Sequence, residues 1–437
     1  MGSWPTRRSS STSGFGASSP EALTQRVVIG AGVVGLTTAL ALQRPGVTVT
    51  LIDRIAPGSG TSSGNAGIIA TSSVHPEAMP GLLSSLPGMV LKPDGAVRLR
   101  PSFLVQRFPW LLRFLAQARP ARAEAASVAT SALSKSALRF WDGLLQEVGL
   151  PSPFVRRGLL YAYGTPQGFA AALRDNAYRE RRAIPFEILS GADARALEPD
   201  LAPSLAGAIY APGAAHHPWP QALSDQLFER FLARGGRFQR ASVRTVARST
   251  EGVSVQLEGQ TLAADQLFVC AGAYSATFTR QLGWSVPLVT ERGYHILHPK
   301  PGVALQRTVL FPELGFAATP MAEGLRLAGT VELASLEAAP DWRRAEGLSR
   351  QAVRVLPQLQ GPGVKPWLGF RPSLPDSLPV LGVAPEAPNQ LFFAFGHGHL
   401  GLTQAAISAT CLAALAEGER PPLDLHPYRI DRRFPLL

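Results

Sequence analysis

Three glycines and an aspartate near the start of the chain have the types and spacing needed to bind a dinucleotide. The apolar stretch 27–29 precedes Gly30-x-Gly32-x-x-Gly35, a helical pattern follows at once, and a second β-branched stretch ends at Asp53. Gly30 allows a tight turn, Gly32 lets the backbone approach a pyrophosphate, and Gly35 lets helix and strand pack closely. The helix N-terminus offers N–H groups to phosphates, and Asp53 can accept hydrogen bonds from a ribose. Strand, turn, helix, strand and acid in this order predict a bound adenine dinucleotide.

A second glycine-rich turn, Gly396-His-Gly-His-Leu-Gly401, opens a helical pattern late in the chain. Backbone N–H groups at a helix start can stabilise the negative charge that a flavin gains at its N1/C2=O edge on reduction. The turn alone fits a helix entry without a ligand equally well, but the upstream fingerprint favours a flavin contact. His397 and His399 have no carboxylate or cysteine nearby in sequence, so we expect no metal site.

Arg371 and Tyr294 are the candidates for holding a substrate. Arg371 lies in Gly-Phe-Arg-Pro, in apolar and rigid surroundings, and a guanidinium is the natural bidentate partner of a carboxylate. Only four of the 42 Lys and Arg residues are lysine, so most arginines must be solvated. Tyr294 and His295 point to opposite faces of an expected strand, so only one can face a site. The alternative for Tyr294 is a core tyrosine whose hydroxyl is already satisfied.

The bulk composition fits an enzyme with a sizeable core. The 437 residues are 46% hydrophobic and 17% charged, which argues against global disorder. The net charge of +11 contains no long block of like charges, so we expect no nucleic-acid partner, whereas an anionic membrane surface or an acidic substrate stays open. Two distant cysteines give no disulfide framework. We expect a cytoplasmic protein, or one bound peripherally at the inner membrane.

The order of the expected elements predicts an α/β fold, α+β overall, in which a Rossmann-like nucleotide-binding domain is interleaved with a substrate domain built on an antiparallel sheet. Residues 1–25 are expected to form a disordered tail. The nucleotide domain is expected to comprise 26–100, 205–285 and 365–430. The substrate domain is expected to comprise 101–204 and 286–364.

Several motifs together resemble the D-amino-acid oxidase superfamily of FAD enzymes. They are the glycine fingerprint, T-S-S-G-N-A-G-I from Thr61, E-R-G-Y-H-I, G-F-R-P-S-L-P-D-S-L-P-V-L-G and F-G-H-G-H-L-G. They are most similar to the bacterial D-amino-acid dehydrogenases, including the D-hydroxyproline dehydrogenase branch, and cover nearly the whole chain beyond residue 25. The resemblance implies FAD as the cofactor. It implies non-covalent FAD, because the cysteine that attaches flavin in some relatives, just before the late turn, is missing here.

The resemblance also implies the residues of the site. Arg371 matches the arginine that binds the amino-acid carboxylate, with Tyr294 as a second donor. The residues expected to bind FAD are Gly30, Gly32, Val33, Val34, Gly35, Asp53, Arg54, Thr61, Ser62, Asn65, Ala66, Gly67, Val243, Gly272, Gly398, His399, Leu400, Gly401, Leu402 and Thr403.

The implied activity is oxidation of an amino or imino acid, such as a D-amino acid, D-proline or D-hydroxyproline, by hydride transfer from Cα to flavin N5 to give an imine. A dehydrogenase that passes electrons to a quinone of the respiratory chain is favoured over an oxidase that uses O2. A sarcosine- or glycine-oxidase-like secondary-amine oxidase is the alternative within the superfamily. The alternatives of another class are an NAD(P)-dependent dehydrogenase and a non-catalytic flavin-binding subunit. The sequence leaves the oligomeric state open.

Overall fold

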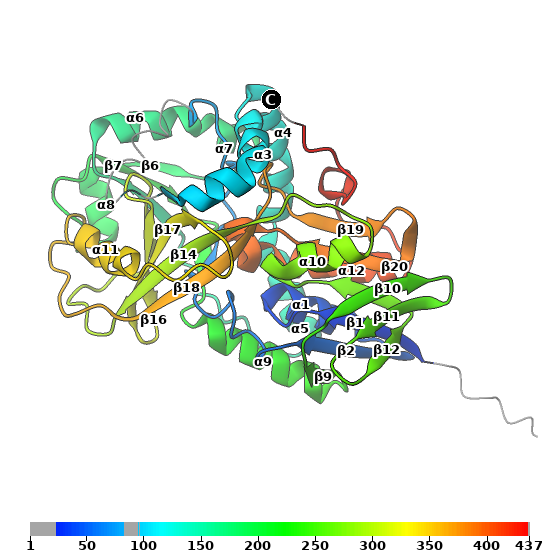
Figure 1. Ribbon diagram of the computed structural model, residues 1–437. Coiled ribbons are helices and arrows are strands. Elements are labelled where there is room, and N and C mark those ends of the chain that lie inside the picture. The colour runs from blue at the N-terminus through cyan, green and yellow to red at the C-terminus, as the bar shows by residue number, and fades with distance from the viewer. Residues whose placement is uncertain (1–22, 83–94, 96, 436–437) are drawn as a thin grey trace, which may run out of the picture.

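The computed structural model of the chain describes residues 23–82, 95 and 97–435, and it contains two large β-sheets (Figure 1). One has six strands and the other nine. The expected tail falls mostly outside the described residues, and its last two residues, from Thr24, already belong to the first strand.

The six-stranded sheet has the order β19-β20-β13-β1-β2-β9. All its neighbours pair in parallel except β19, which runs antiparallel to β20. The strands are β1 (Thr24–Ile29), β2 (Val47–Asp53), β9 (Arg237–Arg240), β13 (Gln266–Val269), β19 (Val380–Ala384) and β20 (Ala387–Phe395). The chain leaves β1 in one direction to β2 and returns on the other side at β13. Ligands of such sheets bind outside the carboxyl ends of the strands at this reversal.

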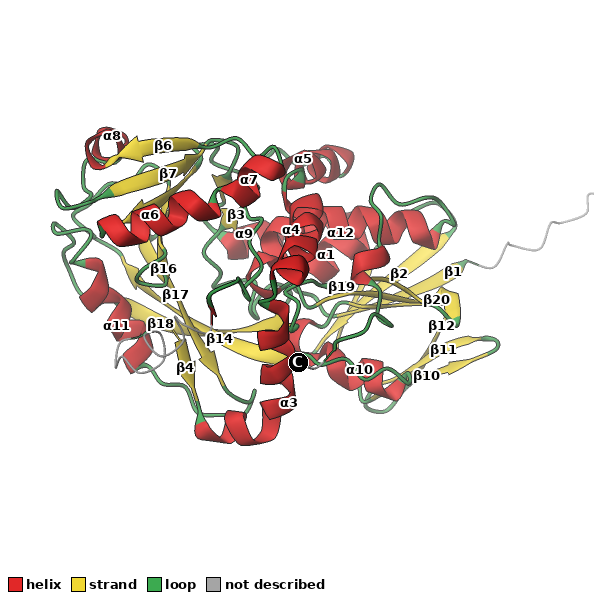
Figure 2. Ribbon diagram, turned by 90° about the horizontal axis from the view of Figure 1, so that it is seen from above, coloured by secondary structure: helices red, strands yellow, loops and turns green. Residues whose placement is uncertain are grey.

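Helices cover one face of this sheet and a small antiparallel meander covers the other (Figure 2). Val28 and Phe268 point into the core shared with the helices, whereas Val27 and Val269 point into the core shared with the meander. The alternation follows from the period of two residues along a strand. The helices are α1 (Val33–Ala41), α4 (Pro120–Ser134), α5 (Ala137–Glu147), α9 (Pro220–Ala233) and α12 (Gly401–Ala416). The meander is β10 (Thr245–Ser249), β11 (Gly252–Gln256) and β12 (Thr261–Ala264).

The nine-stranded sheet is largely antiparallel, in the order β18-β14-β17-β16-β15-β5-β7-β6, with β4 beside β17. Its strands are β4 (Val97–Leu99), β5 (Leu159–Tyr163), β6 (Glu187–Ser190), β7 (Gly207–Ala211), β14 (Val289–His298), β15 (Thr308–Phe311), β16 (Phe316–Met321), β17 (Gly324–Leu333) and β18 (Val364–Ser373). The helices around it are α3 (Pro101–Gln117), α6 (Pro166–Asp175), α7 (Ala177–Arg181), α8 (Gly191–Leu197) and α11 (Arg343–Ala352). A parallel sheet and an antiparallel sheet in one interleaved chain confirm the expected fold class.

The strand pairings differ from the expected domain boundaries in three places. β4, β7 and β18 all belong to the nine-stranded sheet, although their segments were assigned to the nucleotide domain. A strand's partners are set by long-range pairing, which the local pattern does not contain. These differences move more of the chain into the substrate half.

One further segment also differs from expectation. The segment 120–148 was assigned to the substrate domain, but the side chains of its helices, such as Trp141, are buried in the core of the nucleotide domain. Two neighbouring strands of the chain, β9 and β10, lie in different sheets. β9 pairs with β2, and β10 opens the meander.

One helical stretch in the described part of the chain, Gly398–Ala416, is long and apolar enough to cross a membrane by length and composition. About two-thirds of it is buried inside the protein. Its side chains Ala405, Ala406 and Ala409 are fully buried in the core shared with α1, so packing within the fold accounts for its apolar character.

Candidate active site

A cavity of about 1380 Å³ extends from the carboxyl ends of β1, β2 and β13 to the nine-stranded sheet. Pockets for small ligands usually measure about 300–1000 Å³, so this cavity has room for more than one drug-sized molecule. It is lined by all of the residues predicted for the site except Gly35 and Gly67. The sequence-based prediction and the structure therefore place one continuous site at the same location.

The glycine turn after β1 has the tight geometry that its sequence predicts. Gly30 has φ of +103°, and a Cβ there would lie 2.5 Å from the carbonyl oxygen of Cys270. A Cβ on Gly35 would lie 1.7 Å from the carbonyl oxygen of Gly30, so Gly35 supports the turn instead of lining the cavity. Gly32 caps α1, whose first turn contains no acidic residue. The positive end of this helix therefore remains available for a phosphate.

Asp53 is held next to the glycine turn at one end of the cavity. Its Oδ2 accepts a hydrogen bond of 2.7 Å from the backbone N–H of Ala31, and its Oδ1 accepts one of 3.2 Å from Ile55. A carboxylate has further lone pairs that a ribose can use. Arg54 lies over the ring of Tyr274, with 4.2 Å from Cζ to the ring centre, and both residues line this end of the cavity.

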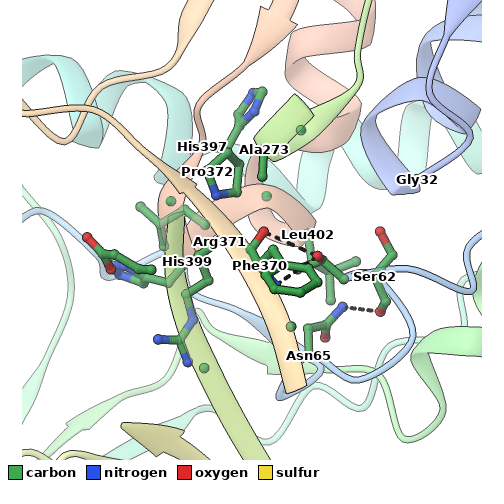
Figure 3. Close-up of a pocket in the computed structure, with 18 of the residues that line it drawn as sticks. Gly32, Ser62, Asn65, Ala273, Phe370, Arg371, Pro372, His397, His399 and Leu402 are labelled. Carbon is green, nitrogen blue, oxygen red and sulfur yellow. Dashed lines mark hydrogen bonds between the residues drawn. The ribbon is translucent and has the colours of Figure 1, made fainter. Parts of the chain in front are cut away.

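The polar loop 61–67 is held by its own side chains. Asn65 donates from Nδ2 to the carbonyl oxygen of Ser62 at 2.7 Å (Figure 3), and its Oδ1 accepts from the N–H of Gly67 at 2.6 Å. The hydroxyl of Ser62 also accepts from the N–H of Val33 at 2.9 Å, which joins the loop to the start of α1. Gly67 has φ of +70°, and a Cβ there would lie 2.3 Å from the carbonyl oxygen of His217. Gly67 therefore shapes the loop and does not line the cavity.

Side chains of the nine-stranded sheet also hold this loop. His295 Nδ1 lies 2.7 Å from the carbonyl oxygen of Gly64, and its ring stacks on Trp367 at 4.9 Å between centroids. Arg326 donates from Nη1 to the carbonyl oxygen of Asn65 at 2.7 Å. Burial and the charge of Arg326 lower the pKa of His295 to about 4. His295 is therefore neutral near pH 7, and its Nδ1 carries the proton because a carbonyl oxygen can only accept.

The late glycine turn opens α12, as its sequence predicts, and its residues line the cavity. The hydroxyl of Thr403 accepts from the N–H of Ala70 at 3.0 Å and donates to the carbonyl oxygen of Ile68 at 3.2 Å. His397 is buried against the hydroxyl of Ser408 at 3.0 Å, and burial lowers its pKa to about 4. Within residues 23–82, 95 and 97–435, no group of three His, Cys, Asp or Glu residues is arranged to hold a metal.

Arg371 reaches across the neighbouring strand β14 from β18. A Cβ on Gly293 would lie 2.3 Å from Nη2 of Arg371, so only a glycine leaves room for the guanidinium. Arg371 Nη1 donates to the carbonyl oxygen of Thr330 at 2.9 Å. Burial lowers the pKa of Arg371, while Glu291 and Glu77 raise it. Among the described residues, no carboxylate oxygen lies within 4.0 Å of the Arg371 guanidinium, the limit for an ion pair. The remaining N–H donors of Arg371, which line the cavity, are therefore available for an anion.

Tyr294 does not have the free hydroxyl that a substrate donor requires. Its hydroxyl donates to Glu332 Oε2 at 2.5 Å and accepts from the N–H of Asp341 at 3.1 Å. Its side chain is buried in the core that contains α11, although the residue contributes to the cavity wall. The alternation of the strand instead turns Glu291 and Gly293 toward Arg371. The expected role for Tyr294 is therefore replaced by that of a core tyrosine.

Sequence reasoning missed several residues that line the substrate end of the cavity. Two are acidic, Glu77 and Glu291, and a further group is apolar or aromatic. Glu291 could have been found from its strand, because it lies two residues before Gly293 in E-R-G-Y-H-I and therefore faces the same side of the sheet. Glu77 lies in a loop without a motif. The apolar group comprises Leu99, Trp110, Phe114, Val331 and Leu333.

Comparison with known families matches residues 26–415 to the family described as DAO, FAD dependent oxidoreductase. The chain belongs to this family. It is 35% identical to a D-amino-acid oxidase of Bradyrhizobium diazoefficiens over 411 residues, which cover 92% of this chain and 97% of the relative. It is 32% identical to D-amino acid dehydrogenase 2 of Ralstonia nicotianae over 434 residues, which cover 93% of this chain and 100% of the relative.

Solved structures show the same fold. The glycine oxidase of Geobacillus kaustophilus superposes with a TM-score of 0.71 at 23% identity, covering 94% of this chain and 99% of that one. The L-proline dehydrogenase of P. horikoshii superposes with a TM-score of 0.70 at 17% identity, covering 93% of this chain and 97% of that one.

The cofactor of this family member is FAD, and the cavity fits it. The cavity is continuous from Asp53 at the ribose position to the turn before α12. A side chain at Gly30 would collide with the backbone of Cys270, and one at Gly35 would collide with the backbone of Gly30. Glycine at both positions keeps the turn tight and leaves the start of α1 open to a pyrophosphate. Gly398 to Thr403 bring the start of α12 to the same cavity, where its N–H groups can stabilise a reduced flavin.

Proposed function

We propose that this protein oxidises D-amino acids with apolar side chains to the corresponding imino acids. The observation that carries the proposal is the placement of Arg371. Its guanidinium has donors available in the cavity that the dinucleotide fingerprint also lines. A carboxylate is the preferred bidentate partner of such a guanidinium.

The preference for the D-configuration is supported by the two relatives at 35% and 32% identity, whose names state D-amino acids as their substrates. The preference for an apolar side chain is supported by the wall beside Arg371. Trp110 and Phe114 stack there at 5.2 Å between ring centroids, and Val331 follows the residue that binds the Arg371 guanidinium. These residues provide apolar surface against which a substrate side chain can be buried.

The protein contributes positioning to the reaction. FAD supplies the acceptor for two electrons when it is bound. Arg371 fixes the carboxylate and so sets the direction of the Cα–H bond, and orientation of this kind can contribute several kcal/mol to lowering a barrier (about 7–11 in the best cases). The apolar wall keeps water away from the reacting carbon. No general base is needed once the amine is neutral.

An anaerobic reduction screen tests the proposal. The purified holoenzyme is mixed, without oxygen, with matched D- and L-amino acids, with sarcosine and with D-proline and D-hydroxyproline, and the visible absorbance of the flavin is followed. We expect the fastest bleaching with apolar D-amino acids. Faster bleaching by sarcosine would favour a secondary-amine oxidase, and no bleaching by any amine would overturn the proposal.

Arg371→Ala tests whether this arginine binds the substrate carboxylate. We expect its apparent affinity for the carboxylate to fall at least tenfold, because a charge-assisted hydrogen bond contributes about 1.5–3 kcal/mol. Unchanged kinetics would remove Arg371 from the site.

The electron acceptor is proposed to be a quinone reached by peripheral contact at the inner membrane from a cytoplasmic location, in keeping with the dehydrogenase named among the relatives. Reoxidation of the reduced enzyme by a soluble quinone analogue and by O2, measured side by side, tests this. Faster reoxidation by O2 would make the protein an oxidase.

A further inference from the structure

Two glutamates face the substrate end of the cavity, and the carboxylate-binding role of Arg371 does not involve them. Glu77 lies in the loop after β3 (Ile68–Ile69), and Glu291 lies on β14. Each carboxyl group shifts the pKa of the other, so the two are close neighbours. Within the described part of the chain, only one other acidic residue lines this cavity, Asp53 at the opposite, nucleotide end. Two neighbouring carboxyl groups in a poorly solvated site do not both ionise readily, so the pair carries one negative charge.

The contacts around the pair place this negative charge on Glu77. His399 Nδ1 lies 2.9 Å from Glu77 Oε1, and the hydroxyl of Ser377 accepts from the backbone N–H of Glu77 at 3.0 Å. Burial opposes the ionisation of Glu77 and is the largest single effect, but the hydrogen bond and charge of His399, the interaction with Glu291 and the charge of Arg371 together outweigh it and lower the pKa to about 2. Glu291 is only 4% exposed, and burial together with the charge of Glu77 raises its pKa well above the usual value.

The pair is adjacent to Arg371. Glu291 is the direct cross-strand partner of Arg371, and Gly293, over which the guanidinium lies, is two residues farther along the same strand face. Arg371 and His399 lie on the same side of β18 (Figure 3). Gly398, at the turn before α12, also lies beside the pair, because a Cβ there would be 3.6 Å from Glu77 Oε1. A free guanidinium and a singly charged carboxyl pair therefore stand next to each other at one end of the cavity.

This arrangement matches the two charges of an amino-acid zwitterion. The carboxylate of an α-amino acid and its ammonium group are separated by a single carbon, so a receptor for both needs a cation and an anion side by side. A carboxylic or hydroxy acid offers no positive charge, so its carboxylate would lie beside the Glu77 carboxylate with no ammonium group between them. Repulsion between like charges costs binding energy, which creates selectivity against such ligands.

We propose that Glu77, held by Glu291 and His399, is the receptor for the α-ammonium group of the substrate and selects amino acids over acids that lack an amine. The inference rests on the proposed function, because it takes Arg371 as the receptor for the carboxylate. Glu77 is the group that touches the ammonium of the bound zwitterion, which releases its proton to water before the hydride leaves from the neutral amine. Glu291 is a positioning residue: its protonated carboxyl group donates a hydrogen bond to Glu77 and fixes the direction of the Glu77 carboxylate.

The test compares two ligands that differ only in the amine. The ligands are D-alanine, whose apparent dissociation constant comes from the concentration dependence of anaerobic flavin reduction, and propanoate, whose dissociation constant comes from perturbation of the oxidised flavin spectrum. Where the screen above selects another amino acid, it and its deaminated analogue replace this pair. The propanoate measurement needs no turnover.

We expect Glu77→Gln to weaken binding of the amino acid at least tenfold and to change propanoate binding less than threefold or to strengthen it. Glu291→Gln reproduces the neutral, hydrogen-bond-donating form of Glu291, so we expect it to change the ratio of the two dissociation constants less than threefold. Arg371→Ala should weaken both ligands. Glu198→Gln is the matched control, because Glu198 is a buried glutamate near the nine-stranded sheet, with a pKa raised by burial, that does not line the cavity.

Parallel weakening of both ligands in Glu77→Gln, or no change in either, would overturn the assignment of Glu77. Loss of amine selectivity in Glu291→Gln but not in Glu77→Gln would overturn it too, because the negative charge that binds the ammonium would then reside on Glu291. Failure of every amino acid to reduce the wild-type flavin, with propanoate still bound, would instead overturn the proposed function. The two failures are therefore distinguishable.

Discussion

The guanidinium of Arg371 lies directly over Gly293, in the space that a side chain at 293 would occupy. A Cβ there would lie 2.3 Å from Nη2 and 2.5 Å from Cζ of Arg371. The two residues are on neighbouring strands, and the Cα partner of Gly293 is Gly369, so the arginine reaches diagonally across the pair. The absence of a side chain at 293 thus determines where the positive charge of the site can be.

Gly293→Ala is expected to displace this guanidinium and raise KM for the amino acid about tenfold or more, because the charge-assisted hydrogen bond to the carboxylate contributes about 1.5–3 kcal/mol. Steady-state kinetics of the holoenzyme measure the change. Gly164→Ala is the control, because the nearest atom to a Cβ there, Oε2 of Glu313, is at an ordinary contact distance of 3.8 Å. An unchanged KM in Gly293→Ala would show that Arg371 binds no carboxylate from this position.

His295→Ala is expected to weaken FAD binding without altering the substrate receptor. The substitution removes the hydrogen bond to Gly64, which contributes about 1 kcal/mol, and the stacking on Trp367, which contributes about 0.5–1.5 kcal/mol. We expect the dissociation constant of FAD to rise about 10- to 70-fold, measured by titrating the apoprotein with FAD.

His298→Ala is the matched control for this experiment. It makes the same change on the same strand, but His298 contacts the hydroxyl of Ser349 at 2.8 Å on α11, away from the loop. Equal loss of FAD in both variants would mean that the strand as a whole, and not the contact with Gly64, supports the cofactor.

The nucleotide half of the site could be predicted from the sequence because its information is local. Gly30, Gly32 and Asp53 lie within 24 positions of one another, and a strand–turn–helix–strand unit allows few arrangements. The same holds for the turn before α12, whose glycines indicate that a helix begins there. In these segments the spacing of the residues almost determines the geometry.

The substrate half could not be predicted in the same way because pairing distant in sequence builds it. Glu77 meets Glu291 across more than 200 positions, and no local pattern of either residue indicates the other. Tyr294 shows the converse. Its place in the motif suggested a donor to the substrate, but its hydroxyl donates instead to Glu332 on the adjacent strand β17. The alternation of side chains along β14 correctly predicts that neighbouring residues face opposite sides of the sheet, but it does not predict which side faces the site.

Gly35→Ala is expected to abolish FAD retention. The added Cβ would lie 1.7 Å from the carbonyl oxygen of Gly30, so α1 must move away from β1 and the turn must open. The measurement is the ratio of flavin to protein absorbance after purification, with circular dichroism to test whether the rest of the chain folds. Gly143→Ala is the control, because a Cβ at that position of α5 meets no atom within 4 Å. A fully flavin-loaded Gly35→Ala protein would contradict the role assigned to this glycine.

Buried histidines predict that the protein loses stability in mild acid. His216 is 2% exposed, and burial, with the charge of Arg157, lowers its pKa to about 4 from an ordinary value of 6.5. The unfolded chain therefore binds a proton below pH 6.5 that the folded chain does not bind until about pH 4. Between these values the free energy of unfolding falls as the pH falls, by about 1.4 kcal/mol per pH unit for each such histidine at full effect.

His216→Met removes the titrating group and keeps a buried apolar side chain of similar size. We expect the dependence of the free energy of unfolding on pH, measured by urea denaturation of the holoenzyme between pH 6.5 and 4.5, to become shallower by up to about 1.4 kcal/mol per pH unit. His426→Gln is the control, because His426 is exposed and its surroundings change little on unfolding. Because His217, His295 and His397 are buried with pKa values also lowered to about 4, the variant should retain part of the acid sensitivity. Identical slopes for His216→Met and the wild-type protein would mean that His216 is already protonated in the folded state above pH 4.5.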